Sequence, residues 1–163
     1  MKNIQIALLT MFVSAGSMAN STIDQYKEMA TQLHQQLLDQ KPAQLEKNAK
    51  NLVDTSKTIV IKSMQALPQC QTYLTALLNA ADKIADLPIE EIESGYHADG
   101  KLPPLKDGSC YHTKDLLVHP ATVQAMAKIG IDSKAQWKQA AHEIEEVLEH
   151  LSAVEAVFAK NDR

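Results

Sequence analysis

The chain has few aromatic residues and almost no arginine. Phe, Trp and Tyr make up only 4% of its 163 residues. A core without many aromatic rings must be built from Leu, Ile, Val, Ala and Met, which is the composition of helical bundles. The only arginine is Arg163, and acidic residues outnumber basic ones by 20 to 16. Nucleic-acid binding requires a clustered basic face and phosphate recognition favours arginine, so we expect no nucleic-acid partner.

The sequence also lacks the short motifs of common enzyme and cofactor classes. It contains no C-x-x-C or C-x-x-C-H spacing, no G-x-S-x-G and no phosphate-binding glycine loop. These absences argue against thiol redox chemistry, c-type haem and the usual hydrolases. A b-type haem would pair Met29 with His142 or His150, but neither histidine lies on the apolar stripe of its helix. We therefore expect a protein that is not an enzyme and has no haem.

No uninterrupted apolar run reaches the ~18 residues that a membrane-spanning helix needs. A shorter apolar stretch, IALLTMFVSAG, follows Lys2 and precedes Ser17-Met18-Ala19. This order is typical of a secretory signal peptide, residues 1–19, with cleavage after Ala19. No cysteine lies at the cleavage junction, so a lipid anchor is not expected. We expect residues 20–163 to form one helical-bundle domain in the periplasm, without a membrane anchor, as a monomer or weak dimer.

Apolar spacing predicts helices over most of this domain. Intervals of three and four residues place an apolar stripe on one face of the segments 22–40, 42–67, 68–87 and 133–160. Prolines and short connections separate the first three segments, so these helices should run up, down and up. The sequence therefore predicts an all-α four-helix bundle that is completed by the long C-terminal helix.

The segment 95–120, GYHADGKLPPLKDGSCYHTKDLLVHP, interrupts the helical pattern. It holds three of the five glycines, three of the six prolines and three of the six histidines. This composition predicts a long irregular crossover loop between the third and fourth helices, and a short helix at 120–128. Loops of this length in compact domains are usually functional or disordered, and the aromatic and apolar content argues against disorder.

The two cysteines, Cys70 and Cys110, are predicted to form a disulfide. An isolated pair in an oxidising compartment most often does so. The bond requires Cys110 to lie within about 6 Å, Cα to Cα, of the start of the third helix. The crossover loop would then be a rigid strap along the bundle.

The histidines of the segment 95–120 lead to two alternative interpretations. His97, His112 and His119, interleaved with Asp99 and Asp115, have the donor atoms of a Zn²⁺ or Cu²⁺ site. Their spacing matches no compact metal-binding motif. In the alternative, their polar atoms bond to the backbone and pack the loop onto the helices.

Three polar residues of the last helix, His142, Glu146 and His150, also share one face. That face lies away from the apolar stripe and is crowded by Glu143, Glu145 and Glu149. We interpret it as a solvated acidic surface; the alternative is a metal ion or a proton-linked contact on the surface of this helix.

These observations favour a non-enzymatic binding protein. The hypothesis is that a rigid surface of the crossover segment binds another protein or a small ligand. The residues expected on that surface are Tyr96, His97, Tyr111, His112 and His119. The alternative function is the binding of Zn²⁺ or Cu²⁺ by the loop histidines.

Overall fold

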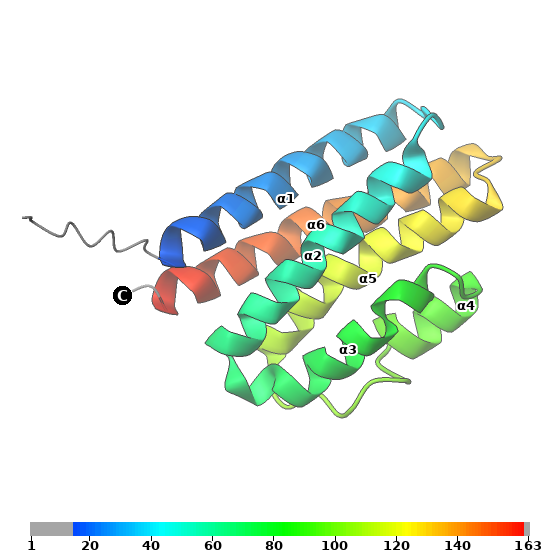
Figure 1. Ribbon diagram of the computed structural model, residues 1–163. Coiled ribbons are helices and arrows are strands. Elements are labelled where there is room, and N and C mark those ends of the chain that lie inside the picture. The colour runs from blue at the N-terminus through cyan, green and yellow to red at the C-terminus, as the bar shows by residue number, and fades with distance from the viewer. Residues whose placement is uncertain (1–14, 162–163) are drawn as a thin grey trace, which may run out of the picture.

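The computed structural model describes the backbone of residues 15–161 and the side chains of residues 22–160, and all its regular elements are helical (Figure 1). In chain order they are α1 (Ala15–Leu38), α2 (Leu45–Ala66), the 3₁₀ turn η1 (Pro68–Cys70), α3 (Gln71–Ile84), α4 (Ile89–Ile92), the π-helical turn η2 (Glu93–His97), α5 (Gly108–Ile129) and α6 (Lys134–Asn161). The predicted signal peptide, residues 1–19, falls mostly outside this part of the chain and stays a prediction. No helix within the described residues has the length and apolarity to cross a membrane.

Four long helices pack side by side, with α3 and α4 against one flank. α1 lies against α2 and α6, and α5 lies against the same two helices. Figure 1 shows that sequence neighbours among these four run in opposite directions. The shorter helices α3 and α4 cover the outer side of α2 and α5. The third member of this group of four is therefore α5, and the segment 68–87, predicted for that place, forms an outer helix.

The apolar stripes predicted from spacing form the core. The stripe of α1 is buried from Ile23 to Leu37, and that of α6 is buried from Ala140 to Phe158. A second cluster of buried residues lies where α3 and α4 cover α2 and α5. Burial of these side chains is the main favourable contribution to folding.

The prediction of an irregular crossover loop at 95–120 is wrong over most of that segment. Only residues 98–107 are without helical structure, while η2 covers Glu93–His97 and α5 covers Gly108–Ile129. The short helix expected at 120–128 is the second half of α5. Residues from Thr113 to Met126 are buried on every side of α5, so this stretch of the helix has no solvent-exposed face. A helix that is buried all round gives no apolar stripe in the sequence.

Local signals begin and end α5. The carboxylate of Asp107 caps its first turn by accepting a hydrogen bond from the Ser109 backbone N–H at 2.8 Å. Gly130 follows its last turn with a φ of 104°, a left-handed conformation that favours glycine. Between these ends, α5 continues through Pro120, which lacks the N–H that would bond to the Leu116 carbonyl. The buried Tyr26 hydroxyl of α1 donates to that carbonyl instead.

Cys70 and Cys110 lie at disulfide distance, as predicted. Their Sγ atoms are 2.07 Å apart and their Cα atoms 5.4 Å apart. This bond joins the first turn of α5 to the start of α3. The segment 98–107 therefore returns along α3 from η2 to reach α5 (Figure 1).

Candidate metal centre

Four of the six histidines gather in a row between η2, α5 and α6. His97 comes from η2, His112 and His119 from α5, and His150 from α6. The ring centroids of His97 and His119 lie 4.7 Å apart, and those of His119 and His150 lie 5.6 Å apart. The row ends at His112, whose ring centroid is 5.1 Å from that of His150.

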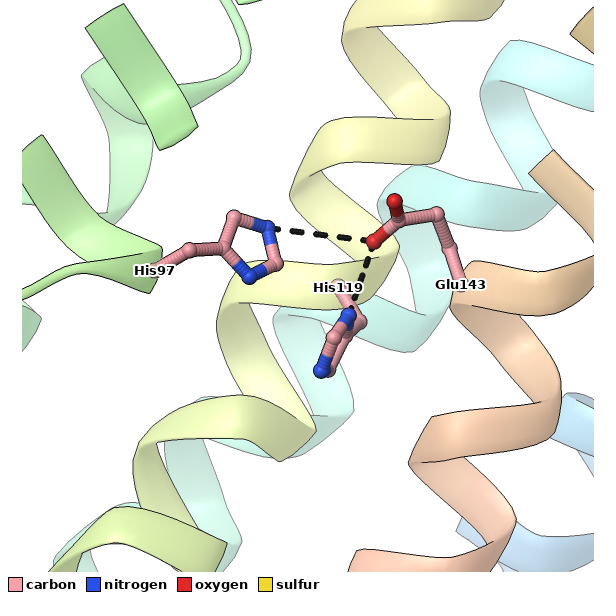
Figure 2. A group of neighbouring side chains, drawn as sticks. All are labelled: His97, His119 and Glu143. Carbon is pink, nitrogen blue, oxygen red and sulfur yellow. Dashed lines mark hydrogen bonds and ion pairs between the residues drawn. The ribbon is translucent and has the colours of Figure 1, made fainter. Parts of the chain in front are cut away.

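At one end of the row, two imidazoles converge on a single carboxylate (Figure 2). His119 Nδ1 lies 2.7 Å from Glu143 Oε2, and His97 Nε2 lies 3.8 Å from the same oxygen. We call His97, His119 and Glu143 the Glu143 group; its three ligand atoms all lie within 4.8 Å of one another. The three side chains are 17%, 5% and 10% exposed. They belong to η2, α5 and α6, so only the packing of these elements brings them together.

Further oxygen atoms surround the Glu143 group. The Thr122 hydroxyl lies 3.0 Å from His97 Nε2, and a Glu93 carboxylate oxygen lies 3.9 Å from it. On the other ring, Glu146 Oε2 lies 3.5 Å from His119 Nδ1. A cation in the Glu143 group would therefore have an oxygen atom in reach as a fourth ligand.

A second group lies on the other side of the His119 ring. His119 Nε2 is 3.9 Å from Asp115 Oδ1, and His150 Nε2 is 3.5 Å from Asp115 Oδ2. We call Asp115, His119 and His150 the Asp115 group; its ligand atoms also lie within 4.8 Å of one another. Asp115 is 1% exposed, and neither of its oxygens has a hydrogen-bond donor in bonding geometry among the described residues.

A buried lysine supplies a positive charge beside the Asp115 group. Lys114 Nζ lies 3.2 Å from Asp115 Oδ1 and 3.3 Å from Asp99 Oδ1. It also donates to the His97 carbonyl at 2.9 Å. Asp99 in turn accepts a hydrogen bond of 2.6 Å from the Tyr73 hydroxyl. This network ties the segment that carries His97 to α3 and α5.

Burial keeps three histidines of the row neutral. It lowers the pKa of His97, His119 and His150 to about 4, because a charged imidazolium loses hydration inside the protein. Near pH 7 these rings are therefore uncharged, and each has a nitrogen lone pair. Neutral imidazole is the form that binds a metal ion.

The neighbouring carboxylates are short of positive charge. Burial raises the pKa of Asp115 to about 6, although the Lys114 ammonium acts in the opposite direction. Burial also raises the pKa of Glu143, and burial with the charges of Glu143 and Glu146 raises that of Glu93. A nearby cation would stabilise the ionised form of each carboxylate.

The residues predicted as ligands from the sequence separate into different places. His97 and His119 come together, and Asp115 lies beside His119 in the second group. His112 is not in either group, because its Nδ1 lies 2.9 Å from the Nδ1 of His150. Asp99 pairs with Lys114 rather than with a histidine.

The sequence did not predict that Glu143 and His150 meet the histidines of the segment 95–120, because the face of α6 that carries them was interpreted as a solvated surface. That interpretation is wrong for both residues, whose side chains are only 10% and 16% exposed. α6 packs against α1 on one face and against α5 on another, so it buries a polar face as well as an apolar one. The signal in the sequence that could have indicated this site was the helix face that Glu143 and His150 share with Glu146. His142, predicted on the same surface, is indeed 64% exposed.

The surface expected on the crossover segment is largely covered. Tyr96 is 8% exposed and His119 is 4% exposed, whereas Tyr111 is 37% exposed. Binding of a partner by these residues stays a prediction.

Comparison with protein-family models, with curated proteins and with solved structures finds no match to this chain.

Proposed function

We propose that the protein binds a first-row divalent transition ion, Zn²⁺ or Cu²⁺, at the Glu143 group. The observation that carries this proposal is the convergence of two ring nitrogens on one carboxylate oxygen (Figure 2). Two histidines and one glutamate are a known Zn²⁺ ligand set, in which a further position stays open for water or another ligand.

The spacing of the donor atoms supports the proposal. Bonds of 2.0 to 2.1 Å in a tetrahedral site place ligand atoms about 3.4 Å apart. The contacts of 2.7 Å and 3.8 Å to Glu143 Oε2 lie on either side of that value. Small side-chain rotations of His97 and His119 would therefore bring all three atoms to bonding distance. Imidazole and carboxylate together suit Zn²⁺ and Cu²⁺, whereas Ca²⁺ and Mg²⁺ prefer oxygen ligands alone.

The charge of the site also supports a cation. The histidines are neutral near pH 7, while Glu143, Glu146 and Glu93 gather around them. Gathering like charges around the buried Glu143 carboxylate is costly unless an opposite charge is present. A divalent ion between His97 and Glu143 would neutralise that charge, because among the described residues Lys114 pairs with Asp99 and Asp115 and not with Glu143.

We propose that the ion is bound in the periplasm and that the protein is not an enzyme. The signal-peptide pattern and the cysteine pair support an oxidising compartment. The absence of catalytic motifs supports binding without catalysis. We also propose that α1, α2, α5 and α6 form a four-helix bundle, a fold whose metal sites are built from side chains on facing helices.

The test is a titration of chelator-treated protein with Zn²⁺, followed by calorimetry, and with Cu²⁺, followed by visible absorption. His97→Ala and Glu143→Gln should each weaken binding at this site by ~100-fold or more, since even outer-shell partners of ligands affect affinity 10- to 100-fold. The matched control is His34→Ala, which removes a histidine of α1 that lies in neither group.

Helical circular dichroism must be unchanged in each variant, so that a loss of binding reports on the site and not on folding. Equal affinity in the wild-type protein and in Glu143→Gln would overturn the proposal. An equal loss in His34→Ala would do the same, because it would show that binding does not depend on this group.

A further inference from the structure

We infer that the cluster holds a second divalent transition ion at the Asp115 group, and that His119 ligates both ions, one through each ring nitrogen. This inference rests on the proposed function and extends it from one ion to two. It assigns Asp115 and His150 as ligands in their own right.

The orientation of the His119 ring allows it to ligate two ions. Nδ1 faces Glu143 Oε2 at 2.7 Å, while Nε2 lies on the opposite side, 3.9 Å from Asp115 Oδ1. Figure 2 shows one ring nitrogen directed at Glu143 and the other directed away from it. One imidazole therefore presents a donor atom to each group. Two bonds of 2.0 to 2.1 Å and the width of the ring place the ions roughly 6 Å apart.

The buried carboxylate of Asp115 also indicates a bound cation. A carboxylate that is 99% buried normally accepts several hydrogen bonds, because dehydration of an ionised oxygen is costly. Nevertheless, neither Asp115 oxygen has a hydrogen bond of good geometry among the described residues, although the Lys114 ammonium and the Tyr111 hydroxyl lie close enough to lower the pKa of its carboxyl. Lys114 forms an ion pair with Oδ1 at 3.2 Å, and Oδ2 faces His150 Nε2 at 3.5 Å. An ion between Oδ2 and the two imidazoles would satisfy this carboxylate.

The second ring of the group is held ready for that role. His150 Nδ1 lies 2.9 Å from His112 Nδ1, so a hydrogen bond between them holds the outer side of the His150 ring. The inner nitrogen, Nε2, then points to Asp115. Metal-bound histidines commonly use their other nitrogen in this way, to fix the orientation of the ring. His112 is therefore a positioning residue and not a ligand.

The protons balance as follows. A neutral His119 ring has one N–H, so ligation of both nitrogens releases one proton and leaves an imidazolate bridge. Glu146, whose Oε2 lies 3.5 Å from Nδ1 and whose side chain is 39% exposed, can accept that proton and pass it to solvent. No electron transfer is involved.

The experiment counts the ions and measures their coupling. Wild-type protein is loaded with excess Cu²⁺, freed of loose ions by gel filtration, and analysed for copper per chain by mass spectrometry. Electron paramagnetic resonance then reports whether two Cu²⁺ ions are coupled through a shared imidazolate. We expect two ions and a coupled spectrum for the wild-type protein. We expect one ion with an uncoupled spectrum for His150→Ala, Asp115→Asn and Glu143→Gln.

The control is His142→Ala, which removes an exposed histidine of α6 and should retain two coupled ions. A wild-type protein with one ion, retained in His150→Ala and lost in Glu143→Gln, would overturn the second site and leave the proposed function standing. Two uncoupled ions would overturn the bridging role of His119. A wild-type protein that retains no ion would overturn both proposals.

Discussion

The hydroxyl of Tyr26 in α1 donates a hydrogen bond to the backbone carbonyl of Leu116 in α5, 90 positions along the chain. In an ordinary helix that carbonyl would accept from the N–H four residues later, but the residue there is Pro120. The contact therefore allows a proline to lie inside the most buried helix of the protein. It also ties α1 to the helix that carries His119.

Replacement of Tyr26 by Phe should destabilise the protein. It leaves the buried Leu116 carbonyl without a donor, which costs roughly 1 to 3 kcal/mol. We expect a loss of that size in the free energy of unfolding, measured by urea denaturation. The matched control is Tyr73→Phe, which removes another tyrosine hydroxyl. Its acceptor, Asp99, is partly exposed and keeps Lys114, so its loss should be smaller.

Replacement of Pro120 by Ala tests whether the Tyr26 hydroxyl compensates for the missing N–H of the proline. Alanine restores the N–H that the Leu116 carbonyl lacks, so Tyr26→Phe should cost less in the Pro120→Ala background. A double-mutant cycle should give a coupling of at least ~0.5 kcal/mol. Strictly additive effects would contradict the role assigned to the tyrosine.

Loss of the disulfide should cost about 4 kcal/mol. Cys70 and Cys110 are 40 residues apart, and the chain-entropy model assigns a crosslink of that span roughly this value. The measurement compares the unfolding midpoint of the wild-type protein with that of the Cys70→Ala, Cys110→Ala double variant. Treatment with reductant should shift the wild-type protein towards the variant and leave the variant unchanged. An equal shift of both proteins by reductant would contradict the prediction.

Gly100 and Gly108 should respond in opposite ways to alanine. A Cβ at Gly100 would clash with the backbone carbonyl oxygen of Ser94, whereas a Cβ at Gly108 meets nothing within 4 Å. We expect Gly100→Ala to destabilise the protein by about 1 to 3 kcal/mol, as overpacking does. Gly108→Ala, in the first turn of α5, should be neutral or stabilising by up to ~1 kcal/mol. Thermal unfolding of the two variants measures the difference, and equal midpoints would contradict it.

The stability of the metal-free protein should fall as the pH is lowered from about 7 to 6. The pKa of His97, His119 and His150 is about 4 in the folded protein, against 6.5 when unperturbed. In this range the unfolded chain binds more protons than the folded one, so acid favours unfolding.

Below pH 6 the carboxylates oppose this effect. The pKa of Asp115 is raised to about 6 from 3.8, so the folded protein takes up that proton first, and the raised pKa of Glu143 acts in the same direction. We therefore expect the slope of stability against pH to increase from pH 7 towards pH 6, and below pH 6 to be smaller than the three histidines alone would give. Urea titrations in the presence of a chelator measure it. His150→Gln should have a shallower slope between pH 6 and 7, and an unchanged slope would contradict the assignment.

Much of the helical content could be predicted from the sequence. α1, α2, α3 and α6 each bury an apolar face, and such a face is visible in the sequence as an apolar stripe of period 3.6. α5 could not be predicted in this way, since it is buried from Thr113 to Met126 and contains Pro120. Its interior position is possible because the missing backbone donor is replaced from α1, which no local pattern can indicate.

The sequence by itself determined the helical class, the apolar faces and the pairing of Cys70 with Cys110, because these depend on local periodicity and on the only two thiols in the chain. Tertiary structure decided which polar residues meet. His97 and His119 were candidates from composition, but Glu143 and His150 lie 24 and 31 positions beyond His119. They reach it only because α6 packs antiparallel to α5 and turns a polar face inward. No local pattern in the sequence indicates that contact, because it depends on how the two helices pack.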